Sequence, residues 1–420
     1  MQINYKKILI ITGFIILCVA IGYGIYFLFF KSSPIIDTGG EESAVSSGNG
    51  DLPTGAEGGN TNIITGTGGS LPEGGGSGTD SAGSAPNPVP ADKIARGGIT
   101  QTSKLNSSPS FAAALSDDGS YVYYYNQDDG KFYKIDSNGQ TSLISNKTFY
   151  NVENVNWAPD KQRAVIEYPD GANILYNFKA QKQVTLPKHW EDFDFSPQSD
   201  KIVAKSMGID SENRWLITAN DDGSRAQAIE HLGDEGDRVY SSWSPNNLSI
   251  ALFTEGMDFD RQKLYFVGQN KENFKATIVE GRGIDFQWTP SGDKLLYSVY
   301  SESTNLKPEL WIVDAKGDSI GSNRQRLNLQ TWAEKCSIYD EKTIYCAVPK
   351  SLPEGAGVFS ELARESTDDI YKINLTNNSC QLIAVPDGEY NMQNIIVSEN
   401  EKYLYFTDSQ TNNIHKIQLK

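Results

Sequence analysis

The chain has 420 residues, and its 53 Asp and Glu outnumber its 37 Lys and Arg, which gives a formal net charge of −16. A phosphate-binding surface needs a basic stripe, and the one basic cluster beyond residue 95 is Arg324 to Arg326, so we expect no nucleic-acid partner. Three histidines and the lack of a Cys-x-x-Cys pair argue against a zinc centre.

The N-terminus predicts a membrane anchor. Residues 8–30 are almost entirely apolar, and as a helix they would span about 34 Å, against about 30 Å for a bilayer core. Lys6 and Lys7 precede this run and Lys31 follows it, so the positive-inside rule places residues 1–7 in the cytoplasm. A cleaved signal peptide is the competing interpretation, but the apolar run is longer than usual and no small-x-small cleavage site closes it. We predict a single-pass cell-membrane protein whose remaining chain is extracytoplasmic.

Residues 31–95 predict a disordered, Gly/Ser/Thr-rich linker. They hold 15 of the 38 glycines, together with Ser, Thr, Asn and Pro. Such a segment cannot bury enough apolar surface to offset the entropy that ordering would remove. We expect a flexible tether, with a wall-crossing or modified stalk as the alternative.

Residues 96–420 repeat one phrase seven times: an aromatic or aliphatic residue, a small residue, often a proline, a polar turn and then a β-rich run. The plainest copies begin at Trp157, Phe195, Trp243 and Trp288, and the weaker ones at Leu115, Cys336 and Val397. Short strands that recur every 40 to 50 residues or so are typical of a β-propeller, in which each repeat is one four-stranded blade. We therefore predict an all-β fold, a seven-bladed β-propeller that follows the transmembrane helix and the linker.

The ends of the repeat region predict how the ring closes. The chain stops after the third strand of the last blade, and residues 99–103 lie just before the first inner strand. They can supply the missing outer strand, which would close the ring and remove a free edge. One long insertion, residues 349–368, joins the second and third strands of the sixth blade, and long ordered loops are usually functional.

Two copies of the phrase resemble the repeat of TolB-like propellers, which reads Trp-Ser-Pro-Asp-Gly before an apolar strand. Residues 243–246 read Trp-Ser-Pro-Asn, and residues 288–292 read Trp-Thr-Pro-Ser-Gly. The resemblance covers about 320 residues and implies a membrane-tethered bacterial propeller. No copy carries the complete motif, and the α/β domain that precedes the propeller in TolB is absent, so TolB's lipoprotein partner is not carried over.

Three of the four cysteines fall in the repeats. Cys336 and Cys346 flank a short turn that would set them side by side on antiparallel strands. They can form a disulfide in an extracytoplasmic domain, or remain buried free thiols. Cys380 is then unpaired, or pairs with one of the other two.

No catalytic constellation is evident. The chain has no Gly-x-Ser-x-Gly elbow, and its histidines, at 189, 231 and 415, are scattered. Acidic runs at 126–130 and 220–223 lack the spacing of an EF-hand loop and are interpreted as hairpin turns. We assign no catalytic residue, no metal ligand and no cofactor.

The pattern most suggestive of recognition is positional. The loops that lead into the inner strands open on one face of a propeller, and the long insertion opens on the same face. Aromatic rings with arginine on a rigid, loop-lined surface are typical of binding hot spots. The alternative is that these rings cap the core between blades. The residues that we predict to bind a ligand are Tyr150, Trp190, Arg238, Arg282, Trp332, Phe359 and Tyr390.

The sequence favours a non-enzymatic, membrane-tethered binding or scaffold protein that recognises a protein, peptide or cell-wall glycan through this face. An alternative is an extracytoplasmic propeller hydrolase or lactonase with an axial metal held by residues from different blades. A further alternative is a structural module within a larger membrane complex.

Overall fold

The computed structural model describes residues 90–272 and 274–420. The predicted cytoplasmic segment (1–7), membrane helix (8–30) and most of the predicted linker (31–95) lie outside the described residues. Within the described part of the chain, no helix has the length and apolarity that crossing a membrane would require.

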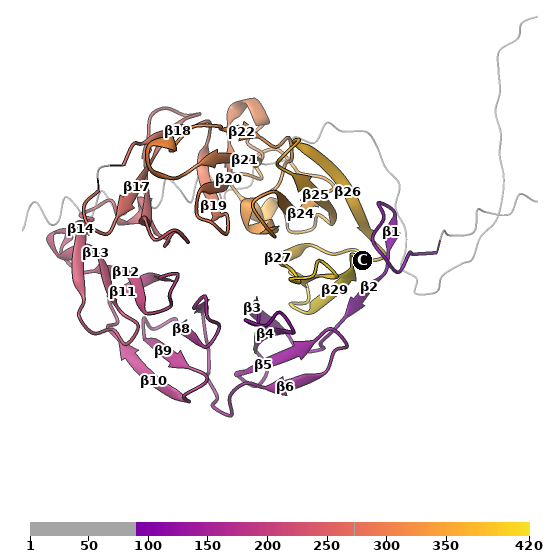
Figure 1. The fold of residues 1–420 in the computed structure, drawn as a ribbon, viewed down its shortest axis with the longest axis horizontal. Coiled ribbons are helices and arrows are strands. Elements are labelled where there is room, and N and C mark those ends of the chain that lie inside the picture. The colour runs from indigo at the N-terminus through magenta and orange to yellow at the C-terminus, as the bar shows by residue number, and fades with distance from the viewer. Residues whose placement is uncertain (1–89, 273) are drawn as a thin grey trace, which may run out of the picture. The chain divides into compact units, whose positions relative to one another are not determined.

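The described residues form seven sheets arranged around a central axis, and the strands within each blade are antiparallel except for one added N-terminal strand (Figure 1). Blade 1 comprises β3 (Ser110–Leu115), β4 (Tyr121–Asn126), β5 (Lys131–Asp136) and β6 (Thr141–Leu143). Blade 2 comprises β7 (Asn154–Trp157), β8 (Arg163–Glu167), β9 (Asn173–Asn177) and β10 (Lys182–Leu186). Blade 3 comprises β11 (Trp190–Phe195), β12 (Lys201–Met207), β13 (Arg214–Asn220) and β14 (Gln227–His231). Blade 4 comprises β15 (Val239–Ser241), β16 (Ser249–Gly256), β17 (Gln262–Gly268) and β18 (Thr277–Val279).

The remaining blades follow the same order from the axis outward. Blade 5 comprises β19 (Arg282–Trp288), β20 (Lys294–Tyr300), β21 (Glu309–Asp314) and β22 (Gln325–Arg326). Blade 6 comprises β23 (Cys336–Ile338), β24 (Thr343–Pro349), β25 (Asp368–Asn374) and β26 (Ser379–Pro386). Blade 7 has β27 (Met392–Val397), β28 (Tyr403–Asp408) and β29 (Ile414–Gln418). The helical segments in the described ranges are short 3₁₀ turns: η1 (Ser211–Asn213), η2 (Gly236–Arg238), η3 (Glu302–Thr304), η4 (Gly317–Ser319), η5 (Ala333–Lys335) and η6 (Ser360–Ala363).

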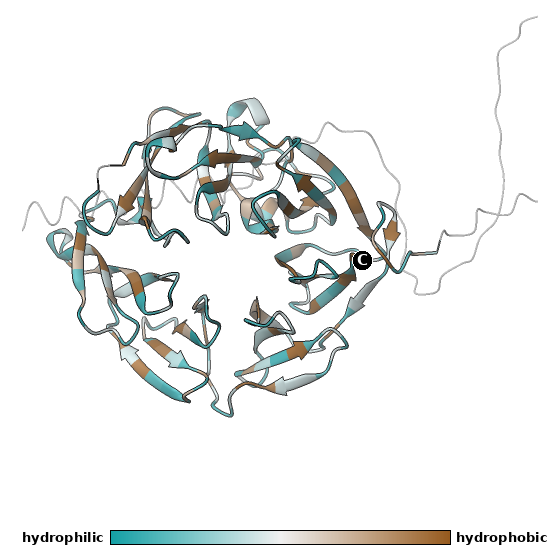
Figure 2. Ribbon diagram, in the orientation of Figure 1, coloured by the Kyte–Doolittle hydropathy of each residue, from teal (hydrophilic) through white to brown (hydrophobic). Residues whose placement is uncertain are grey.

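The predicted all-β, seven-bladed propeller is thus confirmed. Its alternating apolar and polar residues are visible along the strands in Figure 2. Middle strands depart from simple alternation: Ile202, Val203 and Ala204 of β12 are successive residues and all fully buried. A blade packs against a neighbour on each of its two faces, so both faces of its middle strands need apolar side chains.

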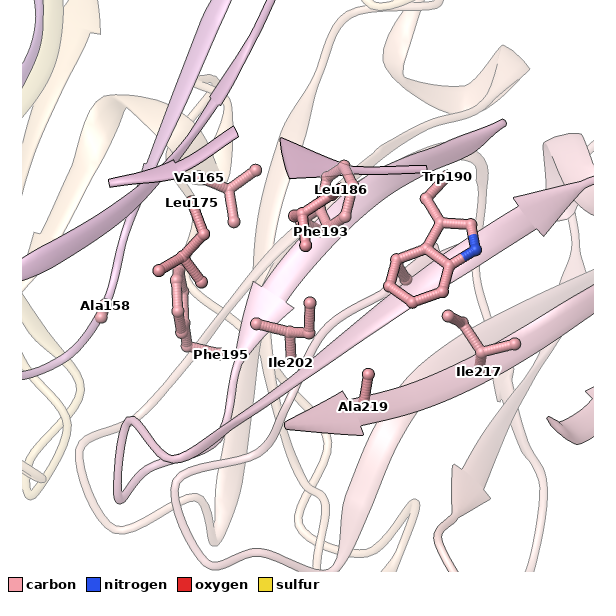
Figure 3. Packing of buried hydrophobic residues seen from close by; sticks show 11 residues of the cluster. Ala158, Val165, Leu175, Leu186, Trp190, Phe193, Phe195, Ile202, Ile217 and Ala219 are labelled. Carbon is pink, nitrogen blue, oxygen red and sulfur yellow. The ribbon is translucent and has the colours of Figure 1, made fainter. Parts of the chain in front are cut away.

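The core is divided into layers between neighbouring blades rather than gathered in one centre. One layer joins Val165 and Leu175 of blade 2 to Phe193, Ile202 and other residues of blade 3 (Figure 3). Burying an aliphatic or aromatic side chain of this size contributes about 1.5–3 kcal/mol. Because each layer belongs to two blades, one blade cannot unfold without exposing the faces of both neighbours.

The N-terminal residues of the domain close the ring, but they divide between two blades. β2 (Thr102–Lys104) pairs antiparallel with β29 and completes blade 7, which confirms the predicted closing strand over those residues. β1 (Ile99–Thr100) instead pairs parallel with β26 and forms a fifth strand in blade 6, so the assignment of 99–100 to the last blade is wrong. The chain changes sheets next to Asp387, whose carboxylate accepts a hydrogen bond from the amide of Thr102 at 2.9 Å.

Deleting residues 98–104 is expected to destabilise the whole propeller, because it removes the outer strand of blade 7 and frees the edge of blade 6. Each lost backbone hydrogen bond contributes about 0.5–1.5 kcal/mol, so calorimetry should show one cooperative transition with a Tm lower by about 5 °C or more. Ser103→Ala and Lys104→Ala change exposed side chains but keep the backbone pairing, and they should leave the Tm unchanged. A deletion variant that melts at the wild-type temperature would contradict this closure.

Candidate functional site

Strand connectivity assigns the loops of the propeller to two faces. We define the upper face as the loops from the fourth strand of one blade to the first strand of the next, together with the loops between second and third strands. Eleven large hydrophobic residues are exposed in the described chain, and seven of them lie in upper-face loops: Tyr150, Ile209, Met257, Phe259, Val358, Phe359 and Leu362. The other four are Ile99, Leu143 and Ile278 on outer strands and Leu248 on the opposite face. Exposed apolar side chains are therefore concentrated on the face that the sequence predicted to bind.

The insertion of blade 6 is held in place by its neighbours. The amides of Gly355 and Gly357 donate to the carbonyl oxygens of Asn305 and Leu306, at 3.1 and 2.7 Å, in the adjoining loop of blade 5. A side chain at position 357 would come within 2.6 Å of Tyr300, so only glycine allows this close approach. Phe359, 62% exposed, and Leu362, 53% exposed, are carried on this fixed loop.

A buried ion pair lies beneath the insertion. The Lys335 ammonium is 2.8 and 3.0 Å from the two carboxylate oxygens of Asp368 and 3.1 Å from the amide oxygen of Asn391. Asp368 also accepts from the Met392 amide at 2.6 Å. Burial raises the pKa of the Asp368 carboxyl, and the Lys335 ammonium opposes that rise. The network joins η5, the start of β25 and the start of β27, and so links the upper-face ends of blades 6 and 7.

The same network fixes the insertion from its C-terminal side. The side-chain amide of Asn391 donates to the carbonyl oxygens of Ala363 and Arg364, each at 3.0 Å. Asn391 thus contacts both the ion pair and the loop that carries Phe359. We infer that loss of the ion pair would loosen the insertion.

A cavity of about 300 Å³ opens between the insertion and the inner strand of blade 7. Trp332 contributes an aromatic ring, while Glu334, Glu361, Arg364 and Gln393 contribute polar groups. Ser409 also lines it, and its buried hydroxyl has no hydrogen-bond partner among the described residues. An aromatic wall beside charged and amide groups can bind a polar ligand that also has an apolar face.

The structure divides the seven predicted site residues into four groups. Trp332 lines the cavity, and Phe359 lies exposed on the insertion beside it. Tyr150 is 74% exposed on the loop between blades 1 and 2. Arg238 forms an ion pair with Glu235, and Arg282 donates to the Asp258 carbonyl oxygen at 2.8 Å, so both brace loops of blades 3 to 5. The side chains of the last two, Trp190 and Tyr390, pack against other side chains of the propeller.

Trp190 was predicted to lie on the binding surface, and the structure corrects this prediction. Its side chain is only 6% exposed and packs in the layer between blades 2 and 3 (Figure 3). It is the first residue of β11, opposite Ser206 of β12, and its indole belongs to the cluster that also holds Leu186 of blade 2 and Ile217 of blade 3. Tyr390 is half-buried against Phe406 and His415, with ring centroids 5.5 and 4.7 Å away. For both residues the alternative interpretation, a cap on the core between blades, describes the structure better.

Other residues of the face were not found from the sequence. The burial of Lys335 had no signal in the sequence: its side chain is 7% exposed and is paired with Asp368. Ile209, Met257 and Phe259 were missed, although large apolar residues within short acidic loops between strands were an available signal.

Cys336 and Cys346 lie directly opposite each other on β23 and β24, and the structure joins them in a disulfide. Cys380 is free and exposed. Across residues 90–272 and 274–420, no three His, Cys, Asp or Glu side chains gather in a way that could hold a metal ion.

Neither a known family model nor a curated protein matches this sequence. Several solved structures resemble the fold. The β-propeller domain of Cps50 (Swd1) from Myceliophteria thermophila covers 76% of this chain and 100% of its own, at 12% identity and a TM-score of 0.49. An oligogalacturonate lyase from Vibrio parahaemolyticus covers 76% of this chain and 93% of its own, at 10% identity and a TM-score of 0.47. The tricorn protease matches 75% of this chain with 34% of its own, at 11% identity and a TM-score of 0.47. These likenesses concern the fold alone.

Replacing Lys335 by Met is expected to destabilise the protein by about 3–5 kcal/mol, because Asp368 would stay buried without a counterion. Hydrogen exchange should increase in residues 350–367 before the rest of the blade. The matched control is Lys350→Met. Lys350 pairs with Asp369 but is 40% exposed, so this substitution should lower the free energy of unfolding by less than about 1 kcal/mol. Adding Asp368→Asn to Lys335→Met should restore part of the loss. Equal effects of the two lysine substitutions would contradict a special role for the buried pair.

Proposed function

We propose that this protein is a membrane-tethered, extracytoplasmic recognition or scaffold protein of a TolB-like bacterial kind, which binds a protein, peptide or cell-wall glycan through its upper face. One observation carries the proposal: seven of the eleven exposed large hydrophobics lie on that face. The membrane anchor, the tether and the extracytoplasmic location come from the sequence alone.

The exposed apolar residues of the upper face lie on ordered loops, and this supports a binding role. Phe359 and Leu362 lie on an insertion held by backbone bonds to blade 5. Phe259 lies in the loop of blade 4, where Asp260 accepts a hydrogen bond from the Glu302 amide of the same blade 5 loop at 2.7 Å. Three neighbouring loops therefore form one braced ridge. Apolar side chains on an ordered support lose little entropy on binding, which is the arrangement of a hot spot.

Charge narrows the partner chemistry. The upper-face loops hold 19 Asp and Glu against 8 Lys and Arg, whereas the loops of the opposite face hold 13 against 9. An acidic face with apolar tips attracts a partner that has Lys or Arg around an apolar patch, and such steering weakens as salt rises. Among the three partner classes, this charge favours a basic protein or peptide.

The double substitution Phe359→Ser and Leu362→Ser is expected to abolish partner capture without altering the fold, because both side chains are exposed. A photo-crosslinking residue placed near them, at Val358, in the full chain in its own membranes should yield a defined product. That product should fall at least about tenfold in the double variant and decrease with added salt. The control is Leu143→Ser, which changes an exposed leucine on an outer strand. The face is refuted if the double variant and the control give the same product yield.

The alternative of a hydrolase or lactonase with an axial metal requires one tightly bound ion per chain. The binding role requires none, so the dialysed full chain is expected to contain no stoichiometric divalent ion by elemental analysis. Chelator treatment should also leave the Tm unchanged. One retained ion per chain, together with a Tm that falls after chelation, would favour the enzyme over the binding protein. The carboxylates around the axis would then be the residues to substitute.

A further inference from the structure

The outer strand of blade 4 covers only part of the strand beside it. β18 pairs with Gln262, Lys263 and Leu264 of β17. β17 continues to Gly268, so Tyr265–Gly268 have β16 on one side and no paired strand on the other among the described residues.

Blades 1 and 5 also have short outer strands, but there the chain continues the pairing. In blade 1 the amide of Ile144 donates to the Phe132 carbonyl oxygen at 2.9 Å. In blade 5 the amide of Leu310 donates to the Leu329 carbonyl oxygen at 3.0 Å, and the amide of Leu327 donates to the Leu310 carbonyl oxygen at 2.9 Å. No such backbone bond reaches Tyr265–Gly268 from another described residue. Among the described residues, this stretch of β17 therefore has no paired strand on its outer side, although Glu272 and Phe274 of the loop that leads into β18 lie against Gly268. We call Tyr265–Gly268 the open edge of blade 4.

A cavity of about 520 Å³ lies against this open edge. Its floor is built from residues that also form the layer between blades 3 and 4, namely Leu216, Leu232 and Val239, which are 0%, 4% and 6% exposed. Phe266 of β17 also lines it. The site thus combines main-chain groups along one wall with an apolar floor deep enough for a side chain.

The rim of this cavity is predominantly acidic. Glu230, Glu235 and Glu272 lie along it, against Lys271 and the exposed His231. A ligand with Lys or Arg beside its apolar residue would be electrostatically matched.

We propose that Tyr265–Gly268 form a binding site for an extended peptide segment, which adds to blade 4 as a strand in line with β18, on the side of its first residue, Thr277. The peptide's main chain would pair with the edge of β17, one apolar side chain would enter the cavity, and a basic residue would face the glutamates. β18 supports this occupant because it already pairs with the same edge three residues earlier. Strand addition takes its affinity from main-chain bonds and its specificity from alternate side-chain pockets. The site lies beside the outer strands of blades 3 and 4 and borders the upper face through Leu232 and Glu235 of the loop of residues 232–238. Strand pairing along β17 does not require the proposed function of that face.

The test starts from a phage-displayed library of random twelve-residue peptides selected on the full chain. Enriched peptides should alternate apolar and polar residues and carry Lys or Arg. N-methylation of every second peptide amide, in the phase that faces β17, should weaken binding at least about tenfold, whereas methylation in the other phase should have little effect. A difference between the two methylation phases would show that the peptide pairs as a strand through its backbone and does not bind through its side chains alone.

Protein variants locate the site independently. Glu230→Lys with Glu235→Lys, both exposed, should weaken binding at least about fivefold, while Asp210→Lys with Glu212→Lys, on the neighbouring blade 3 loop, should not. Bound peptide should slow hydrogen exchange within Tyr265–Gly268, with Gln262–Leu264 as the internal reference that is already paired.

Three outcomes would overturn the proposal: no enrichment above a selection without protein, loss of binding in both methylation phases, or unchanged binding to the Glu230→Lys and Glu235→Lys variant. A concentration-dependent dimer that protects the same residues without any peptide would assign the edge to a second copy of this chain and also overturn it.

Discussion

The structure depends on closure of the ring, because every apolar layer lies between two blades. The central strands, such as β12 with its buried Ile202, Val203 and Ala204, have no solvent-facing side. A gap at any position would expose two such faces at once. Pairing of β2 with β29 is therefore more than a local contact of three residues, since it is the one place where the two ends of the propeller chain meet in a sheet.

A second constraint operates near the axis, where polar side chains join one inner strand to the next. Asn394 of blade 7 donates to the Ala113 carbonyl oxygen of blade 1 at 2.8 Å, and Gln287 of blade 5 donates to the Ala333 carbonyl oxygen at 2.6 Å. Asp194 of blade 3 accepts from the Trp243 amide of blade 4 at 2.6 Å. Burial raises the pKa of Asp194 to about 7, although this amide and that of Phe195 oppose the rise. These polar side chains connect neighbouring blades near the axis.

The fold could be predicted because its signal is local and repeated. A turn such as Trp-Ser-Pro-Asn at 243–246 is determined by its own residues, and Ser244 alone bonds to the amides of Leu248 and Ser249 and to the Ser249 carbonyl oxygen. The burial of individual loop residues could not be predicted, because it depends on contacts with residues that are distant in the sequence. Trp190 is buried in the layer between blades 2 and 3. Lys335 is paired with Asp368 and Asn391, which follow it by 33 and 56 residues. Phe359 was predicted to bind a ligand because it lies on the long insertion, and the structure places it there with 62% of its side chain exposed. The open edge of β17 had no signal in the sequence, since it depends on where β18 begins to pair.

Closure and the upper face are coupled through blade 7. Asn391, which fixes the insertion and accepts from Lys335, immediately precedes β27, the inner strand of that blade. β27 is paired with β28, β28 with β29, and β29 with β2. The residues that support Phe359 and Leu362 are thus attached to the same sheet that the N-terminal strand completes. Within the same domain, the edge of β17 belongs to blade 4, whose own sheet is continuous without β2. Weakening the closing strand should therefore disturb the insertion first, while the open edge of blade 4 changes only when the ring as a whole unfolds.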